Sequence, residues 1–127
     1  MTNLTILYIE DNPTNVRLIS RLLSSRPGFH LITAHEPYLG LQLAEQHRPD
    51  LILLDINLPG IDGFEVLKRL KETPSCADIP TIAISANATE SYIQKGKEAG
   101  FAEYITKPID IPDFFSTINE VTQRRKR

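Results

Sequence analysis

The sequence predicts an α/β fold in which a parallel sheet is covered by helices on both faces. Short apolar runs alternate along the whole chain with segments of helical periodicity. One of these runs, residues 51–54, is apolar at every position, which is typical of a strand buried on both faces of a parallel sheet. Each expected strand is followed by an expected helix, and such right-handed crossovers place helices on both faces.

The first two strand–helix units have clear boundaries. Residues 4–9 form the first expected strand, and the Asn12-Pro13 dipeptide supplies an N-cap and a first-turn proline for the next helix. Arg26-Pro27-Gly28 ends that helix. The second strand is expected at residues 30–34 and its helix at about 37–47. The apolar faces of the two helices consist of Val16, Ile19, Leu22, Leu23, Leu39, Leu43 and Ala44.

The remaining three units follow the same pattern. Strands are expected at residues 51–54, 81–84 and 102–105, and helices at about 64–72, at 89–99 and from Asp110 onward. The last helix has the clearest stripe, with apolar residues at i, i+3, i+4 and i+7: Ile111, Phe114, Phe115, Ile118 and Val121. The helix at 89–99 has a thin apolar face, mainly Ile93 and Ala99, so we expect it to be the least firmly anchored.

Composition narrows the class of protein. The 127 residues suffice for one domain with a core, and 41% hydrophobic with 24% charged residues is ordinary for a globular domain. The net charge of −2 argues against a nucleic-acid surface, and the basic residues 124–127 are interpreted as a solvated helix end. Cys76 is the only cysteine, which excludes a disulfide framework. Without a signal peptide or a membrane-length apolar segment, we expect a cytoplasmic protein with no membrane insertion.

Polar residues stand at the ends of four of the expected strands. Five parallel strands fit the flavodoxin-like order 2-1-3-4-5, in which ligands bind at the carboxyl ends of the strands. Strands 1, 3, 4 and 5 are then consecutive neighbours, and they are followed by Glu10 and Asp11, by Asp55, by Ser85 and by Lys107. We therefore expect three carboxylates, a hydroxyl and an amine to meet at one edge of the sheet.

The combination of these residues indicates a phosphoryl site. Singly, each has an ordinary interpretation: the paired acids complement a helix dipole, Asp55 lies in a loop, and Ser85 and Lys107 are solvated. Three crowded carboxylates repel one another, however, and need protonation or a cation. An oxygen-rich cluster without His or Cys favours Mg²⁺. Mg²⁺, a lysine and a hydroxyl around one carboxylate make a receptor for a phosphoryl group.

On these residues the chain resembles the CheY-like receiver domain of two-component response regulators, across residues 4–122. The matching pieces are Glu10-Asp11, Asp55 in LILLDINLPGIDG, Ser85 in AISANA, Tyr104, and Lys107-Pro108 in YITKPI. The resemblance implies a single receiver domain over residues 1–127, with a core at about 4–122 and a basic tail at 123–127.

The resemblance also implies a role for each acidic residue. Asp55 would be the phosphoacceptor. Asp11 and Asp55 would bind Mg²⁺ directly, together with the backbone carbonyl of Asn57, and Glu10 would act through a metal-bound water. Lys107 would pair with the phosphoryl group from the other side.

A switch is implied by the same resemblance. Ser85 and the backbone N–H of Ala86 would bond phosphoryl oxygens, and without phosphate Ser85 is expected to lack a strong partner. With phosphate bound, Ser85 would be drawn inward with the start of the fourth helix, and Tyr104 would turn inward to fill the space behind it. The surface of the fourth helix, fifth strand and fifth helix would then be the output face. The Lys107-Pro108 bond is expected to be cis.

The implied partners are a histidine kinase or a histidine phosphotransfer protein and a downstream protein effector, with no nucleic acid bound by this domain. The chain would be a stand-alone receiver or one excised from a hybrid histidine kinase. It would not be an enzyme beyond slow self-phosphorylation and autodephosphorylation.

Three alternatives were weighed against this interpretation. A phosphatase of the haloacid-dehalogenase type would want an acid where Asn57 stands. FMN binding would need a phosphate loop where the chain has Glu10 and Asp11. A phosphorylation-dead interaction domain would lack one of the required residues, all of which are present.

Overall fold

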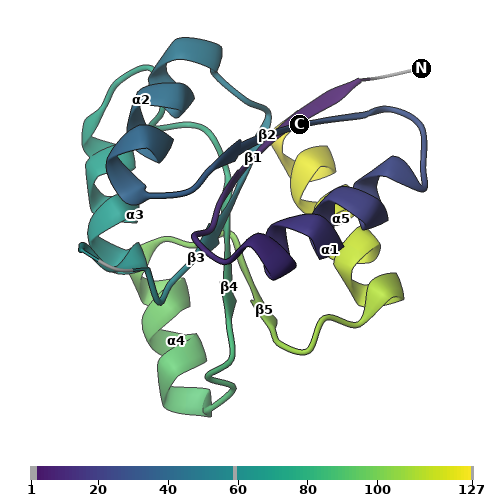
Figure 1. Ribbon diagram of the computed structural model, residues 1–127. Helices are drawn as coiled ribbons and strands as arrows, with labels where there is room; N and C mark the ends of the chain where they lie inside the picture. The colour runs from purple at the N-terminus through teal and green to yellow at the C-terminus, as the bar shows by residue number, and fades with distance from the viewer. Residues whose placement is uncertain (1–2, 59, 127) are drawn as a thin grey trace.

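In residues 3–58 and 60–126, which a computed structural model describes, five parallel strands form one sheet in the predicted order β2-β1-β3-β4-β5 (Figure 1). The strands are β1 (Leu4–Ile9), β2 (Phe29–Ala34), β3 (Leu51–Asp55), β4 (Thr81–Ser85) and β5 (Glu103–Thr106). The helices are α1 (Pro13–Ser24), α2 (Pro37–His47), α3 (Gly63–Glu72), α4 (Glu90–Ala99) and α5 (Ile111–Lys126).

Two helices cover one face of the sheet and three cover the other, within the described residues (Figure 1). Ile6 and Tyr8 of β1 point into the core beneath α1 and α5, whereas Leu7 and Ile9 point into the core beneath α2, α3 and α4. Every residue of β3 is buried, as the uninterrupted apolar run predicts. Asp55 therefore stands at the carboxyl end of a strand that is covered on both faces.

Three strands, β3, β4 and β5, end one residue later than predicted, and in β3 and β4 this places a polar side chain of the site inside the sheet. Asp55 is the last residue of β3 and pairs with Ile84, while Ser85 is the last residue of β4 and pairs with Thr106. The pairing between strands continues through Asp55 and Ser85, because the neighbouring strand extends far enough to pair with each of them. Asp55 and Ser85 are therefore fixed by backbone hydrogen bonds rather than carried on loops.

The Asn12 cap of α1 is confirmed. The Asn12 side chain accepts hydrogen bonds from the backbone N–H groups of Thr14, at 2.8 Å, and Asn15, at 3.4 Å. The first turn of α1 contains no acid. The neighbouring Glu10 and Asp11 are thus not needed to start the helix.

Two residues assigned to apolar helix faces, Ile111 and Ala99, are exposed instead. Ile111 is 49% exposed, and Ile109, in the loop before α5, packs on the core instead. Ala99 is exposed because α4 ends there, and Phe101, just beyond the helix, is buried in its place. Of the α4 residues, all of which are described, Gly96 alone is buried, which confirms that α4 has the thinnest apolar face.

None of the helices in the described part of the chain is both long enough and apolar enough to cross a membrane.

Candidate functional site

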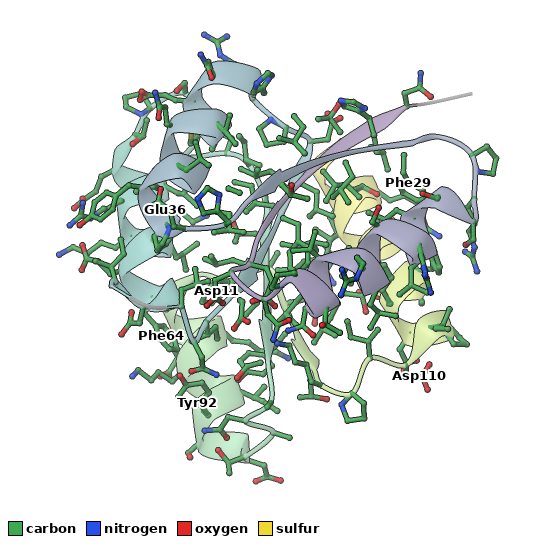
Figure 2. All side chains as sticks on the ribbon, in the orientation of Figure 1. Asp11, Phe29, Glu36, Phe64, Tyr92 and Asp110 are labelled. Carbon is green, nitrogen blue, oxygen red and sulfur yellow. The ribbon has the colours of Figure 1, made fainter. Side chains whose placement is uncertain are left out.

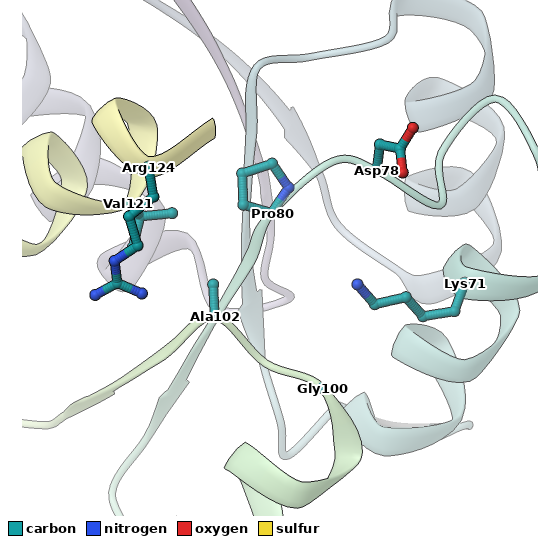
Figure 3. A pocket seen from close by; sticks show the side chains of 7 residues that line it. All are labelled: Lys71, Asp78, Pro80, Gly100, Ala102, Val121 and Arg124. Atoms are coloured by element: carbon teal, nitrogen blue, oxygen red, sulfur yellow. The ribbon is translucent and has the colours of Figure 1, made fainter. Parts of the chain in front are cut away.

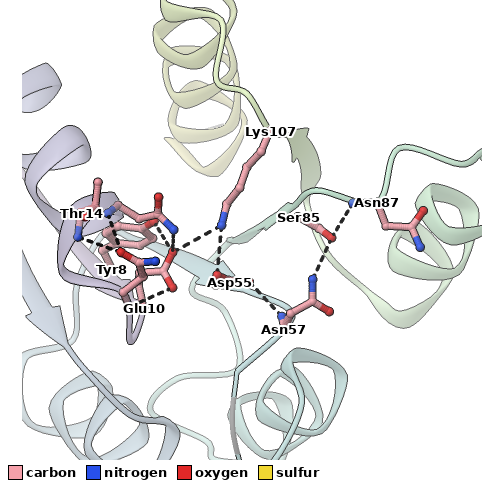
Figure 4. A network of polar contacts seen from close by, with 10 residues as sticks. Tyr8, Glu10, Thr14, Asp55, Asn57, Ser85, Asn87 and Lys107 are labelled. Carbon is pink, nitrogen blue, oxygen red and sulfur yellow. Dashed lines mark hydrogen bonds and ion pairs between the residues drawn. The ribbon is translucent and has the colours of Figure 1, made fainter.

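The polar residues expected at the strand ends do meet at one edge of the sheet. One carboxylate oxygen from each of Glu10, Asp11 and Asp55 lies within 4.8 Å of the others. The Lys107 amine reaches into this acidic cluster and lies 3.2 Å from Asp55 Oδ2 and 3.5 Å from Glu10 Oε1 (Figure 4). The Lys107-Pro108 peptide bond is cis, as expected. The predicted juxtaposition of three carboxylates and an amine is therefore confirmed.

The two neighbouring acids have different environments. Glu10 is 1% exposed, whereas Asp11 is exposed to solvent. Burial raises the pKa of the Glu10 carboxyl, and the hydrogen bond and charge of Asp55 raise it further, while Asn15 and Lys107 lower it. Glu10 is thus a buried acid that depends on its donors, and Asp11 is open to an incoming ligand.

Asp55 is oriented through both of its carboxylate oxygens. The backbone N–H of Asn57 donates to Oδ1 at 2.9 Å, and Lys107 contacts Oδ2. The carboxylate is 5% exposed at the end of β3. This arrangement fixes the direction in which Asp55 presents its oxygens.

Ser85 differs from the expectation that it has no strong partner. Its side chain is fully buried, and Oγ accepts a hydrogen bond from the backbone N–H of Asn87 at 3.1 Å. The Asn57 side-chain amide approaches the same oxygen at 3.5 Å (Figure 4). The partner exists because the loop after β4 turns back over the strand end. Ala86, the residue between them, is exposed.

Tyr104 connects that loop to α4. Its hydroxyl donates to the carbonyl oxygen of Asn87 at 2.8 Å. Its ring packs edge-on against Tyr92, with ring centroids 6.3 Å apart. A Cβ atom at Gly96 would lie 3.0 Å from Tyr104 Cδ2, so α4 approaches the ring this closely only because residue 96 is glycine. Where α3 and α4 meet, Tyr92 also packs edge-on against Phe64 (Figure 2).

The donor set of the acidic cluster fits Mg²⁺. All three candidate ligands are carboxylate oxygens, which suit a hard cation. One amine faces three acids, so negative charge exceeds positive charge at this edge. A divalent cation would offset that excess in a place where burial strengthens the repulsion.

Sequence reasoning missed the groups that hold Glu10. The Tyr8 hydroxyl and the Asn15 side-chain amide both donate to Glu10 Oε1, at 3.0 and 2.9 Å. Burial and the neighbouring Glu10 raise the pKa of the Tyr8 phenol, so this hydroxyl stays a donor at neutral pH. One signal was available: Glu10 directly follows the strand and stands two residues after Tyr8, so the alternation of the strand places both side chains on one face.

A hollow of about 300 Å³ lies at the opposite edge of the sheet, where β4 and β5 begin (Figure 3). Lys71 and Arg124 line it. Arg124 is already paired with Glu103, at 2.9 Å, and with Glu120. Because the charge of Arg124 is already paired, the hollow is a weaker candidate for a phosphate site than the acidic edge.

Comparison with known proteins gives one consistent result. A model of the response regulator receiver domain matches residues 6–119. The polar-differentiation response regulator DivK of Brucella anthropi is 39% identical over 114 residues, covering 90% of this chain and 92% of that protein.

Solved structures agree in fold. A putative response regulator from Chloroflexus aurantiacus has a TM-score of 0.89 at 25% identity, covering 96% of this chain and 99% of that one. The receiver domain of the sensor histidine kinase PA1611 from Pseudomonas aeruginosa has a TM-score of 0.86 at 27% identity, with the same coverage of 96% and 99%. That structure is described as having a magnesium ion coordinated in its active site cleft.

Proposed function

The chain belongs to the receiver domains of two-component response regulators, and from this membership we propose that Asp55 is its phosphoacceptor. The observation that carries the proposal is the contact of the Lys107 amine with Asp55 inside a cluster of three carboxylates. Asp55 is the acid of this cluster that ends the central strand and contacts Lys107 at 3.2 Å, its shortest ion pair in the site.

The proposed reaction transfers a phosphoryl group from a phosphohistidine to Asp55. A carboxylate oxygen of Asp55 forms a bond to phosphorus, the P–N bond of the donor breaks, and its electron pair returns to the imidazole. The product is an acyl phosphate, and its phosphoryl group carries a charge of about −1.5 to −2, as on other phosphorylated side chains. Lys107 would offset that charge, and the Ser85 hydroxyl with the Ala86 N–H would bond phosphoryl oxygens.

Mg²⁺ is the proposed cofactor. Asp11, Asp55 and the backbone carbonyl of Asn57 would hold it directly, and Glu10 would hold it through a water molecule. The charge excess of the acidic cluster supports this assignment, as does the description of a magnesium ion in the PA1611 receiver domain. When bound, the ion would supply positive charge to the phosphoryl oxygens during transfer.

The proposed phosphodonor is a histidine kinase or a histidine phosphotransfer protein, and the proposed output is a downstream protein effector. The net charge of −2 supports a protein partner rather than nucleic acid. We place the domain in the cytoplasm, as a signalling phosphoacceptor with at most slow self-phosphorylation and autodephosphorylation. A haloacid-dehalogenase-type phosphatase is disfavoured, because Asn57 cannot act as a general acid.

Incubation of the protein with Mg²⁺ and a small acyl phosphate should produce a single phosphoryl adduct, measured as the mass of the intact protein. The adduct should not form when a chelator removes Mg²⁺, because the crowded carboxylates would then repel the incoming phosphate. An absent adduct would contradict the proposal. Continuous release of phosphate at high turnover would instead favour a phosphatase.

We further propose that phosphorylation acts on α4, β5 and α5 through Asn87. This residue donates its N–H to Ser85 and accepts the Tyr104 hydroxyl on its carbonyl oxygen. If Ser85 turns to a phosphoryl oxygen, Asn87 loses a bond and the loop is free to shift, together with Tyr104. Because α4 buries only Gly96, it offers little resistance to that shift.

A phosphoryl mimic such as beryllium fluoride should therefore change the backbone amide chemical shifts of α4 and β5 in NMR spectra. The Ser85→Ala variant is the matched control, because it binds the mimic at Asp55 yet lacks the hydroxyl that moves. Its α4 shifts should stay close to those of the unliganded protein. Wild-type shifts confined to residues 10–11 and 55–57 would refute this route.

A further inference from the structure

The Tyr8 hydroxyl is buried, although the packing of the core does not require it. Tyr8 is fully buried within the apolar run of β1, beneath α1 and α5, where a phenylalanine would fill the same space. Burying a hydroxyl is costly unless it is hydrogen-bonded. The Tyr8 hydroxyl donates a hydrogen bond to Glu10 Oε1, at 3.0 Å. The hydroxyl is therefore tied to the acidic cluster rather than to the core.

Asn15 reaches the same oxygen from another element. It lies in the first turn of α1, and its side-chain amide donates to Glu10 Oε1 at 2.9 Å. With Lys107 at 3.5 Å, Oε1 has three donors around it. Glu10 Oε2 has a weaker contact, from the Asn12 backbone N–H at 3.4 Å. The two oxygens of Glu10 are thus held unequally, and Oε2, whose contact is the longer one, keeps the capacity to accept a further hydrogen bond.

The neutral donors also affect Lys107. The amine stands between Glu10 and Asp55, slightly closer to Asp55. Because Tyr8 and Asn15 already satisfy Glu10 Oε1, the buried Glu10 does not require the full charge of Lys107. The Lys107 amine can then pair mainly with Asp55.

We propose that Tyr8 and Asn15 are positioning residues for the metal site: they fix Glu10 through Oε1, so that Oε2 can bind a water molecule of a hydrated Mg²⁺. This inference rests on the proposed function, since it assumes that the acidic cluster binds Mg²⁺. Partners that orient metal ligands commonly contribute about 10–100-fold to metal affinity. Because Glu10 acts through water, we expect an effect at the lower end of that range.

The test is the dissociation constant of Mg²⁺, measured by isothermal titration calorimetry on the unphosphorylated protein. Tyr8→Phe keeps the ring in the core and removes only the hydroxyl, and it should raise the dissociation constant about tenfold. Asn15→Ala should do the same from the half-buried surface of α1. Tyr38→Phe and Asn119→Ala are matched controls at exposed positions and should bind Mg²⁺ like the wild type.

A double-mutant cycle separates positioning from packing. In a Glu10→Ala background, Tyr8→Phe should cause no further loss of Mg²⁺ affinity, since the group it orients is gone. An equal loss in both backgrounds would overturn the inference, and so would unchanged affinity in Tyr8→Phe and Asn15→Ala. If Tyr8→Phe does not fold, Asn15→Ala tests the inference through the same double-mutant cycle with Glu10→Ala.

The outcomes also distinguish this inference from the proposed function. A wild-type protein that binds Mg²⁺ and forms the adduct, with variants that bind equally well, refutes only the positioning role. A wild-type protein that neither binds Mg²⁺ nor forms the adduct refutes both.

Discussion

Asp55→Asn is expected to abolish the phosphoryl adduct completely. An amide oxygen is a poor nucleophile and cannot become an acyl phosphate, so no other change in the site would restore the reaction. The substitution preserves size, and the amide oxygen can still accept the Asn57 N–H that now bonds Asp55 Oδ1 at 2.9 Å. The fold should therefore survive. The measurement is the intact mass after incubation with Mg²⁺ and a small acyl phosphate.

The matched control is Asp113→Asn, an acid of the first turn of α5 that is exposed and outside the acidic cluster. This variant should form the adduct to the wild-type extent. Survival of the adduct in Asp55→Asn would assign the phosphoryl group to another residue. Circular dichroism of both variants would exclude unfolding as the cause of any loss.

Most of the site was predictable because parallel strands place their carboxyl ends at one edge. Once the strand order is known, Glu10, Asp55 and Lys107 are expected at the same edge of the sheet, because each stands at or directly after the carboxyl end of its strand. The apolar run of β3 and the Asn12 cap are similarly local signals, and both are confirmed. The prediction therefore succeeded where the geometry of the sheet determines the result.

The errors occur where a side chain's partner depends on the path of a loop. Without phosphate, Ser85 was expected to lack a strong partner, but its Oγ accepts a hydrogen bond from the backbone N–H of Asn87, which the turn after β4 places there. Helix periodicity likewise overlooked that Phe101 and Ile109, which flank helices, replace Ala99 and Ile111 in the core. Periodicity identifies the apolar face of a helix, and it does not locate the residues at which the helix begins and ends.

Tyr8 was missed for a different reason. In an apolar strand, a tyrosine is normally counted as an aromatic core residue, and its ring does lie in the core. The hydroxyl matters only because Glu10, on the same face of the strand, is buried rather than solvated. The burial of an acid beyond a strand end is a tertiary property, since it depends on α1 and on the loop after β5.

Lys107→Gln is expected to slow adduct formation about 10²–10³-fold, which is the usual effect of removing one preorganised donor from a site of developing charge. The amine contacts Asp55 at 3.2 Å and is a quarter exposed, so its charge is only partly screened. Glutamine can still donate a hydrogen bond but carries no charge. The rate is measured by intact mass at several times after addition of a small acyl phosphate, and the exposed Lys68→Gln serves as the matched control.

The same variant should bind Mg²⁺ at least as tightly as the wild type. Lys107 contacts two of the three carboxylates, Glu10 and Asp55, and its positive charge opposes that of an incoming cation. Without Mg²⁺, the variant should melt at a lower temperature than the wild type, because its acidic cluster has lost its counter-charge; added Mg²⁺ should narrow that gap. A loss of both the rate of adduct formation and the Mg²⁺ affinity would show instead that Lys107 holds the carboxylates in place. An amine that acts on the phosphoryl group should lower the rate without lowering the affinity.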